Sequence, residues 1–393
     1  MKGLKLEDMI VRAAEATAGH VAAAKAAIGN VIFGQEKVVE QTLITVLCGG
    51  HGMLVGVPGL AKTKLVETLG IVLGLDARRI QFTPDLMPSD ILGSEVLDQA
   101  ADGARSFRFI RGPVFAQLLM ADEINRASPR TQLALLQSMQ EKHVTVAGKR
   151  YDLPGPFHVL ATQNPLEQEG TYPLPEAQVD RFMLKVVLNY PTKEEEKAIV
   201  NLVSGQGLHE AIHMASEEDV LKCRKLVNEI YMDDKLLDYI VNLVAATRDP
   251  AGVGIKDLAN LIEYGASPRT SISLAKASKA HALLRGRGYV TPQDVKSIGM
   301  DVLRHRVAVT YEAEAEDKSS EDIVQKILDE LAELLKVIER LRAILASDRL
   351  LMQIIVDELK QVREQYGDER EYSGAVVKPI WLLMMRCTVP PTR

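Results

Sequence analysis

Apolar and polar positions along residues 36–191 follow two alternating patterns. Short apolar runs are separated by longer stretches in which apolar residues recur at a period near 3.6. The stretches with a period near 3.6 predict helices over 36–47, 63–73 and 131–141. The short apolar runs predict strands over 53–55, 79–82, 118–121, 157–162 and 183–187. Buried strands separated by helices are typical of a mostly parallel sheet with helices on both faces, so we expect an α/β fold.

Two segments of this region alternate apolar and polar residues at a period of two instead. Residues 93–109 do so around Asp102-Gly103, and residues 143–153 around Ala147, Gly148 and Lys149. Alternation about a turn signal is typical of a β-hairpin. We expect both hairpins to be inserts that project from the α/β domain.

After Pro191 the pattern predicts helices alone. Thr192 with Glu195 forms a possible capping box, and the pairs Ser267-Pro268 and Thr291-Pro292 are typical helix starts. The predicted organisation is N-terminal helices over 1–30, an α/β domain over 31–191, a helical domain over 192–316, an antiparallel helical hairpin over 320–371 and a tail without a readable pattern over 372–393.

Composition restricts the class of protein. The chain has 393 residues, 47% of them hydrophobic, and a formal net charge of −6, which gives no global attraction to nucleic acid. Cys48, Cys223 and Cys387 lie far apart, without the spacing of a zinc site or a disulfide framework. A reducing, cytoplasmic location is therefore expected. Glu7 and Asp8 interrupt any apolar leader segment.

Residues 41–61 contain no Asp, Glu, Lys or Arg, and the stretch is long enough for a membrane span. Glycines and Pro58 interrupt it, however. We interpret it as a helix end, a short buried strand and a glycine-rich loop, and expect no membrane span.

That loop carries the clearest chemical signal in the chain. It follows a predicted strand and opens a predicted helix, the context of a phosphate-binding P-loop. Its backbone N–H groups and the helix N-terminus attract phosphate. Lys62 would reach the β- and γ-phosphates, and the Thr63 hydroxyl would bind Mg²⁺. Ala61 stands where the motif has glycine; alanine can adopt helical φ and ψ, so the loop can form if that position is helical. A glycine turn before a chance Lys-Thr is the alternative. The candidate nucleotide-binding residues are Gly56, Val57, Pro58, Gly59, Leu60, Ala61, Lys62, Thr63 and Lys64.

Two adjacent carboxylates end the predicted strand 118–121. Asp122 is a candidate Mg²⁺ ligand, and Glu123 is a candidate base for the attacking water. Such a pair alone is usually a solvated strand end. Together with the P-loop it predicts ATP hydrolysis, because each motif supplies a part that phosphoryl transfer needs.

Four motifs together resemble the MoxR family of AAA+ ATPases, over about residues 32–311. They are GVPGLAKT at 56–63, ADEINRA at 121–127, ATQNP at 161–165 and EAQVDRF at 176–182. The resemblance implies a P-loop AAA+ parallel-sheet domain with two hairpin inserts, followed by a helical lid. It also implies that alanine is acceptable at position 61.

The resemblance also implies roles for single residues. Asn164 matches sensor 1, Arg181 an arginine finger acting on a neighbouring subunit, and Arg269 the sensor 2 of the lid. From the residues alone, these could be a turn before Pro165, a surface ion pair and a helix-start arginine. The segment matching the adenine pocket, otherwise ordinary core, is Val31, Ile32, Phe33 and Gly34.

The C-terminal segment has a different pattern. Leucine and isoleucine from Leu331 to Leu345 step by three and four residues, a short heptad seam. Residues 331–371 resemble the coiled-coil hairpin of type II DNA topoisomerase A subunits. The chain that combines these two resemblances could be a natural mosaic, a misjoined reading frame or an engineered fusion, and all three origins stay open.

These observations predict an Mg²⁺-dependent ATPase that forms a homo-oligomeric ring, with a hexamer expected because the finger comes from a neighbour. The resemblance implies chaperone-like maturation of a client protein complex, with a von Willebrand factor A domain protein as a possible partner. Alternatives are a chelatase- or helicase-like motor and a nucleotide-gated scaffold with little turnover. Nucleic-acid binding is not expected, and only the topoisomerase-like segment points to it.

Overall fold

The computed structural model describes residues 19–99, 105–166, 170–204 and 210–331. Packing divides the chain into two compact units, Met1–Asp238 with Pro268–Arg306, and Tyr239–Ser267 with Val307–Arg393. This division does not follow the predicted boundary at residue 192, and the domain assignments stay predictions. Within the described ranges, every helix is too short or too polar to cross a bilayer.

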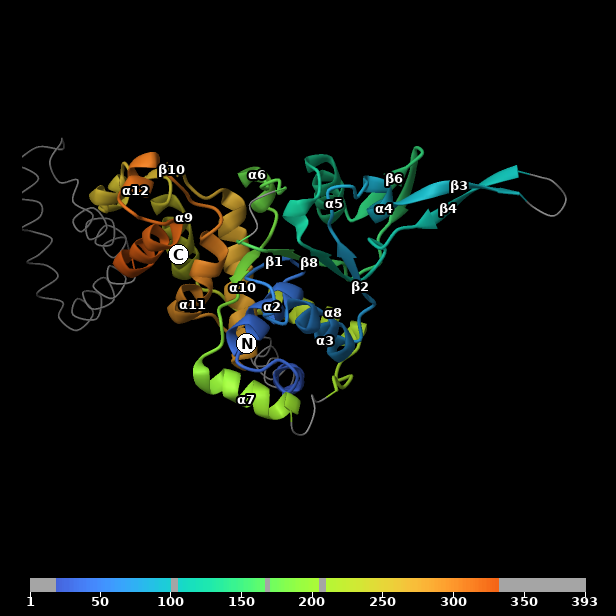
Figure 1. The fold of residues 1–393 in the computed structure, drawn as a ribbon. Coiled ribbons are helices and arrows are strands. Elements are labelled where there is room, and N and C mark those ends of the chain that lie inside the picture. Colours follow the sequence, from blue (N-terminus) through green and yellow to red (C-terminus); the bar gives the residue numbers. More distant parts are fainter. Residues whose placement is uncertain (1–18, 100–104, 167–169, 205–209, 332–393) are drawn as a thin grey trace, which may run out of the picture. The chain divides into compact units, whose positions relative to one another are not determined.

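A five-stranded parallel sheet forms the centre of the first unit (Figure 1). The strand order is β2-β5-β8-β1-β9, and every neighbouring pair is parallel. The strands are β1 (Gly52–Val55), β2 (Ala77–Gln81), β5 (Leu118–Asp122), β8 (His158–Gln163) and β9 (Leu184–Val187). The predicted α/β fold is therefore confirmed, with all five strands within two residues of their predicted positions.

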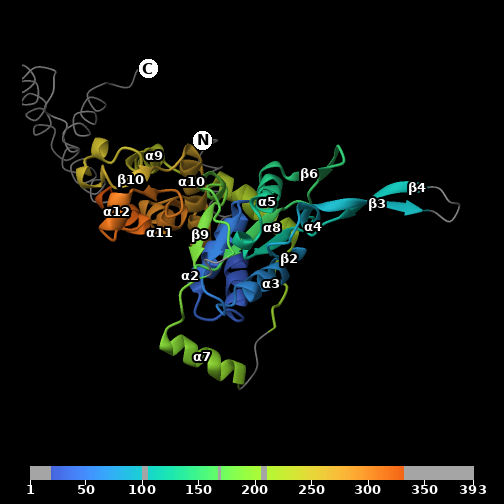
Figure 2. The ribbon, with the colours of Figure 1, turned by 45° about the horizontal axis from the view of Figure 1, so that its top comes forward.

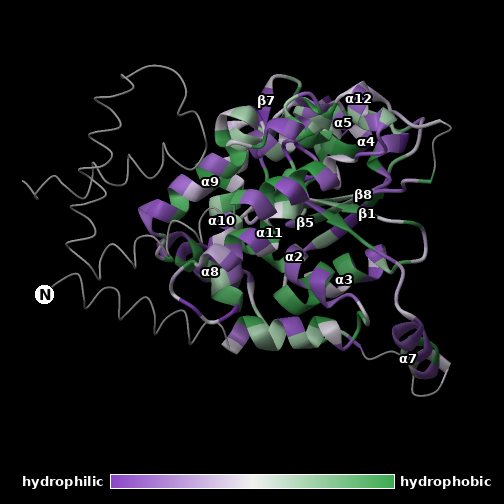
Figure 3. Ribbon diagram, turned by 90° about the vertical axis from the view of Figure 1, so that its left-hand side faces the viewer, coloured by the Kyte–Doolittle hydropathy of each residue, from purple (hydrophilic) through white to green (hydrophobic). Residues whose placement is uncertain are grey.

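Helices cover both faces of this sheet. Figures 1 and 2 show α4 and α5 on one face and α2 and α3 on the other. Leu119, Ala121 and Ala161 face the core shared with α5, while Leu118 and Met120 point to the opposite side and are equally buried. Burial on both faces explains why these strands are continuously apolar, as Figure 3 shows by colour. The helices are α2 (Glu36–Leu47), α3 (Lys62–Leu73), α4 (Pro88–Leu92) and α5 (Pro129–Glu141).

Both predicted hairpins are present. The first consists of β3 (Gly93–Gln99) and β4 (Arg105–Arg111), and it extends far from the sheet in Figure 1. The second consists of β6 (His143–Val146) and β7 (Lys149–Asp152). Phe109 of the first stacks on Tyr151 of the second, with ring centroids 4.1 Å apart. The inserts therefore support each other at their bases.

Three of the remaining helices, α7, α10 and α11, begin at the predicted start signals. Thr192 and Glu195 exchange hydrogen bonds at the start of α7, and Asp294 accepts from the Thr291 N–H at the start of α11. In Figure 2, α7 lies apart from the other helices of this unit. These helices are α6 (Glu176–Val179), α7 (Lys193–Ser204), α8 (Glu217–Glu229), α10 (Pro268–Leu284) and α11 (Pro292–Leu303), and α9 (Asp234–Ala246) runs into the second unit.

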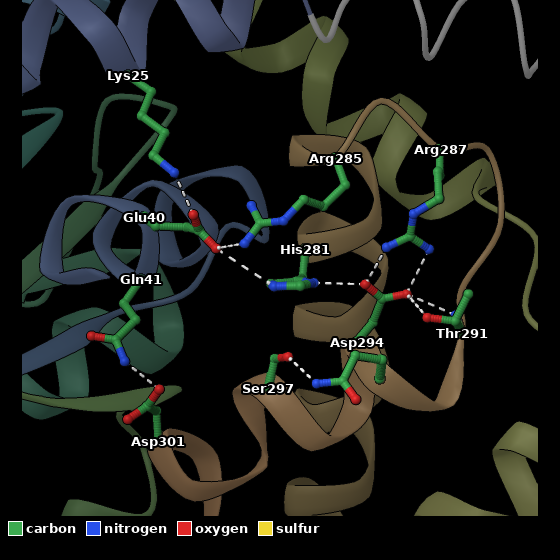
Figure 4. A network of polar contacts seen from close by, with 11 residues as sticks. Lys25, Glu40, Gln41, His281, Arg285, Arg287, Thr291, Asp294, Ser297 and Asp301 are labelled. Carbon is green, nitrogen blue, oxygen red and sulfur yellow. Dashed lines mark hydrogen bonds and ion pairs between the residues drawn. The ribbon is translucent and has the colours of Figure 1, made fainter. Parts of the chain in front are cut away.

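A polar network joins α2 to α10 and α11 (Figure 4). Glu40 of α2 accepts hydrogen bonds from Lys25 and Arg285 and lies 3.5 Å from the His281 ring. His281 in turn contacts Asp294 at 2.6 Å. Burial alone raises the pKa of Asp294, but hydrogen bonds from its neighbours in the network outweigh burial and lower it. The carboxylate is therefore charged, and it holds these helices together.

The second unit corrects one expectation. Residues after 191 are not helical alone, because β10 (Ile262–Tyr264) pairs with β11 (Ala308–Val309) in an antiparallel ribbon. Strands this short are below the length at which a period can be recognised. The unit also holds α12 (Tyr311–Ala315), and residues 320–331 are helical.

Two predicted regions lie largely outside the described residues. Residues 19–29 of the predicted N-terminal helices are helical, and residues 1–18 are not described. The helical hairpin is described only up to residue 331. Its antiparallel fold and its resemblance to a topoisomerase segment stay predictions, as does the tail.

Stability should fall in acid because of a buried histidine. His51 accepts a hydrogen bond from the Val159 N–H and donates one to the Met139 carbonyl. Burial lowers the pKa of His51 to about 4, and the charges of Lys142 and Arg224 add to that effect. The unfolded chain binds this proton at a pKa near 6.5. His51 therefore stabilises the fold above pH 6.5 and loses that contribution as pH falls towards 4.

The free energy of unfolding should fall by about 3 kcal/mol as His51 is protonated, since each pKa unit corresponds to about 1.4 kcal/mol. Urea unfolding at a series of pH values measures it. His51→Asn keeps an acceptor for the Val159 N–H, and its stability should depend less on pH between 6.5 and 4. An unchanged pH dependence in this variant would contradict the assignment.

Candidate nucleotide site

The parallel sheet brings the predicted chemical groups to one edge. β1 ends at Val55, β5 at Asp122 and β8 at Gln163, and Val55 is in register with Gln163. Because the carboxyl ends of parallel strands meet at the same edge, the residues that follow them lie together. The Gly56 N–H donates to the Gln163 carbonyl at 3.2 Å, which ties the start of the loop to this edge.

The loop between β1 and α3 has the features of a phosphate-binding loop. A side chain at Gly56 would meet Leu188 at 2.9 Å, so the close approach requires glycine. Gly59 has a φ of 87°. The Lys62 ammonium donates to the carbonyls of Gly56 and Val57, and it thus lies over the loop. The start of α3 supplies free N–H groups at the same place.

Ala61 corrects a second expectation. The sequence allowed the loop if this position was helical, but Ala61 has φ 55° and ψ 23°, in the left-handed region, and the loop forms nonetheless. The chain must turn sharply between the loop and α3, and this turn requires a positive φ. An L-residue there costs about 1–2 kcal/mol, which explains why glycine is usual at this position of the motif.

The two acids at the end of β5 are held by different partners. Asp122 accepts from the Thr162 hydroxyl at 2.5 Å and from Arg79 at 2.5 and 3.0 Å. Glu123 accepts from Gln81 at 2.7 Å and from Arg126 at 2.9 Å. Glu123 has a φ of 55°, so the strand ends abruptly and the two carboxylates diverge.

A single cavity of about 410 Å³ contains these groups. Asn164 is buried at its wall, and its side-chain oxygen accepts from the Leu166 N–H at 3.1 Å. Most of the predicted nucleotide and catalytic residues thus share one space. The lining residues are Pro58, Gly59, Leu60, Ala61, Lys62, Thr63, Lys64, Asp122, Glu123 and Asn164.

The segment predicted to line the adenine pocket lies next to the loop. Val31 and Ile32 are buried, and Phe33 is half-buried. Gln35 donates from Nε2 to the Leu60 carbonyl at 3.3 Å. The segment is thus attached directly to the phosphate-binding loop.

The donor set fits magnesium. The Thr63 hydroxyl and the Asp122 carboxylate line the same cavity, and both are oxygen ligands. No group of three or more His, Cys, Asp or Glu able to hold a metal occurs in the part of the chain that the structure describes. A metal here would take its other ligands from phosphate and water, as Mg²⁺ commonly does.

Arg181 and Arg269 lie elsewhere. They line a separate cavity of about 290 Å³, which shares no lining residue with the first. Arg181 donates to the Leu136 carbonyl at 2.9 Å, while its Nε is buried without a partner among the described residues. Arg269 is 60% exposed and lies 3.8 Å from Asp180. The structure therefore groups these two arginines together, away from the P-loop of their own subunit.

Sequence reasoning missed the partners of the two acids. Arg79 and Gln81 alternate along β2 and so share a face, but this matters only once β2 is known to lie beside β5. Thr162 belongs to a motif that was noted, without a role for this residue. Arg126, which lies in the ADEINRA motif, pairs with Glu123.

Comparisons with known proteins identify the class of this site. Residues 51–184 match the model of the ATPase family associated with various cellular activities (AAA). Residues 257–327 match the AAA lid domain. A crystal structure of a candidate ATPase from Cytophaga hutchinsonii has a TM-score of 0.76 and 44% identity, covering 84% of this chain and 98% of that one. The protein is a P-loop ATPase of the AAA+ type.

Relatives narrow the class to one family. Chaperone MoxR1 of Mycobacterium tuberculosis is 45% identical over 305 residues, which cover 78% of this chain and 80% of that protein. Protein MoxR of Paracoccus denitrificans is 32% identical over 324 residues, covering 78% and 93%. The chain belongs to the MoxR family, as its motifs predicted.

The left-handed alanine gives a direct test of the loop geometry. Ala61→Gly should raise the free energy of unfolding by about 1 kcal/mol, because glycine adopts a positive φ without strain. Nucleotide affinity should be retained, since the backbone N–H groups are unchanged. Urea unfolding without nucleotide is the measurement.

Ala134→Gly is the matched control. Ala134 lies inside α5, where glycine costs about 1 kcal/mol relative to alanine, so its stability should change in the opposite direction. Destabilisation by both substitutions would show that Ala61 is not strained.

Proposed function

We propose that this ATPase hydrolyses ATP with Mg²⁺ in a homo-oligomeric ring and uses the cycle to remodel or mature partner proteins. One observation supports it above the others. The loop, both acids and Asn164 line one cavity, whereas Arg181 and Arg269 line another. Each subunit thus carries the two halves of a hydrolytic site in two different places. A complete site would form where the first cavity of one subunit meets the second cavity of its neighbour.

The first cavity supplies binding and water activation. The loop N–H groups, the α3 N-terminus and Lys62 hold the phosphates. Thr63 and Asp122 would hold Mg²⁺. An ion held there would offset the negative charge of the phosphates. The segment from Val31 to Gly34 packs against the adenine.

The chemical step depends on two side chains of this cavity. Asn164 orients the attacking water, and Glu123 takes its proton as the water oxygen bonds to the γ-phosphorus and the bond to ADP breaks. Because Arg126 and Gln81 hold Glu123 in place, its carboxylate is already aimed when the water arrives.

The second cavity supplies positive charge to the neighbouring subunit. The Nε of Arg181 has no hydrogen-bond partner among the described residues, and Arg269, which lines the same cavity, is exposed. Two cations stabilise the charge that develops on a transferring phosphoryl group. In this arrangement Arg269, the sensor 2 residue, acts together with the finger on the neighbour's nucleotide.

A chaperone-like role is supported by the relatives. MoxR1 of M. tuberculosis is described as a chaperone. The projecting β3–β4 hairpin offers exposed Leu97 and Phe107 at paired positions of one face, suited to a client protein. A hexameric ring and a partner with a von Willebrand factor A domain stay part of this proposal, and the client is unassigned.

Two substitutions in the first cavity should separate ATP binding from ATP hydrolysis. Lys62→Ala should lose ATP affinity, because the phosphates lose their main side-chain cation. Glu123→Gln should bind ATP at near-parental affinity and hydrolyse it at least ~100-fold more slowly, since general-base catalysis contributes roughly 10²–10⁴-fold. Calorimetric titration and single-turnover assays measure the two properties. Parental hydrolysis by Glu123→Gln would exclude this glutamate as the base, and weak turnover by the parent itself would favour a nucleotide-gated scaffold.

The second prediction concerns assembly. Arg181→Ala should bind ATP normally yet hydrolyse it roughly 10³-fold more slowly, the low end for an arginine finger. Parental specific activity should rise with protein concentration as rings form. Mixing Arg181→Ala with Glu123→Gln subunits should restore activity, because some interfaces then join an intact finger to an intact base. Activity in a strictly monomeric sample would contradict the ring.

A further inference from the structure

Arg306 follows α11 and is the most deeply enclosed charge near the second cavity. Only 2% of its side chain is exposed. A buried guanidinium is stable only when its five N–H donors are matched by acceptors. Its acceptors are therefore part of what it does.

These acceptors are concentrated on one short segment, 180–183. Nε of Arg306 donates to the Asp180 carboxylate at 2.7 Å. Nη2 donates to the carbonyls of Asp180 at 3.2 Å and Phe182 at 2.7 Å, and Nη1 to that of Met183 at 3.1 Å. His305 donates to the Phe182 carbonyl at 3.0 Å. The guanidinium thus fixes the backbone on both sides of position 181.

Arg181 is the residue between these fixed points. Its own N–H donates to the Gln178 carbonyl at 3.2 Å, and the next side chain, Phe182, is fully buried. The Cα of Arg181 therefore cannot shift without breaking the contacts of Arg306. Its side chain is left to reach into the second cavity.

Arg269 is connected to the same guanidinium through a shared carboxylate. Oδ1 of Asp180 accepts from Arg306, and Oδ2 lies 3.8 Å from Arg269. Asp180 thus has one oxygen on a buried cation and the other beside an exposed one. The first contact orients the carboxylate, and the second directs Arg269 towards the cavity that it shares with Arg181.

We propose that Arg306, acting through Asp180 and the backbone of residues 180–183, is the positioning residue for both arginines that serve the neighbouring subunit. The inference rests on the proposed function. Lysine would not replace it, because a single ammonium cannot supply the planar fork that reaches a carboxylate and three carbonyls of this segment. Among the described residues that line its own P-loop cavity, Arg306 does not occur.

A purely structural role would attach the end of α11 to the start of β9 without affecting catalysis. The two roles differ in where the defect is felt. A positioning defect lowers turnover at the neighbour's site, whereas a structural defect lowers stability alone.

The decisive variant is Arg306→Lys in the full chain. Its ATP affinity and KM should match those of the parent, while kcat of the assembled ring should fall ~10–100-fold, as a displacement near 1 Å can produce. Mixing it with Glu123→Gln subunits should restore activity. Mixing it with Arg181→Ala subunits should not, because no subunit then offers an intact arginine pair. Parental kcat, or a loss that Glu123→Gln subunits do not restore, would overturn the proposal.

Arg287→Lys is the matched control. Arg287 lies between α10 and α11. Like Arg306, it makes a two-pronged contact with an aspartate, in this case Asp294 of α11, at 2.5 and 2.8 Å (Figure 4). Among the described residues, Arg287 hydrogen-bonds to Tyr289 and Asp294 and not to residues 180–183. It should lower the melting temperature and leave kcat of the assembled ring unchanged. An equal loss of kcat in this control would show that any weakening of the packing between these helices lowers kcat, and it would overturn a specific positioning role for Arg306.

Asp180→Asn covers the case in which Arg306→Lys does not fold. The amide oxygen still accepts from Arg306, but the charge beside Arg269 is lost. Its loss of kcat should not add to that of Arg269→Ala, because both changes act through the same side chain. Full additivity would overturn the route through Asp180. If Arg181→Ala itself keeps parental activity, the proposed function fails instead, independently of Arg306.

Discussion

The parallel register of β5, β8 and β1 is the constraint on which the nucleotide site depends. It pairs Val55 with Gln163 and Ala121 with Ala161, so the three strands end within one residue of the same level and the residues after them converge. A slip of β5 by one residue would exchange the faces of Ala121 and Asp122, because side chains alternate along a strand. The carboxylate would then enter the apolar core shared with α5. Burial of both sheet faces therefore protects the position of the acids as well as the fold.

Charge in the first cavity is balanced by the protein itself. Arg79 and Arg126 pair with Asp122 and Glu123, and Lys62 binds loop carbonyls. In the proposed mechanism, ATP and Mg²⁺ would exchange partners with these groups on entering, with Lys62 passing from carbonyls to phosphates and Asp122 from Arg79 to the metal. Such exchange lowers the cost of leaving charges unpaired in either state. The arginines thus belong to the site through the two acids that they pair with.

Sequence patterns predicted what repeats over several residues. The five strands, both hairpins and the P-loop helix were found because period, turn signals and motif spacing agree. The ribbon of Ile262–Tyr264 with Ala308–Val309, and the short helix Glu176–Val179, are too brief to show a period. The conformation of Ala61 was missed because composition does not reveal φ. Arg79 and Gln81 became visible only with the strand order, which depends on long-range pairing.

Within the first unit, α11 is connected to α2, whose preceding residue Gln35 binds the P-loop, and to the segment that carries Arg181. Asp294 and Asp301 connect it to α2, directly or through His281, and Arg306 connects its end to residues 180–183. A movement of α11 against α2 would separate buried charges from their partners. The free-energy cost of an unpaired buried charge is far larger than the stabilisation that a surface ion pair contributes. The P-loop and the arginine pair of one subunit are therefore held at a fixed relation. In the proposed ring, the distance between an arginine and the phosphate it serves then changes mainly by movement of whole neighbouring units.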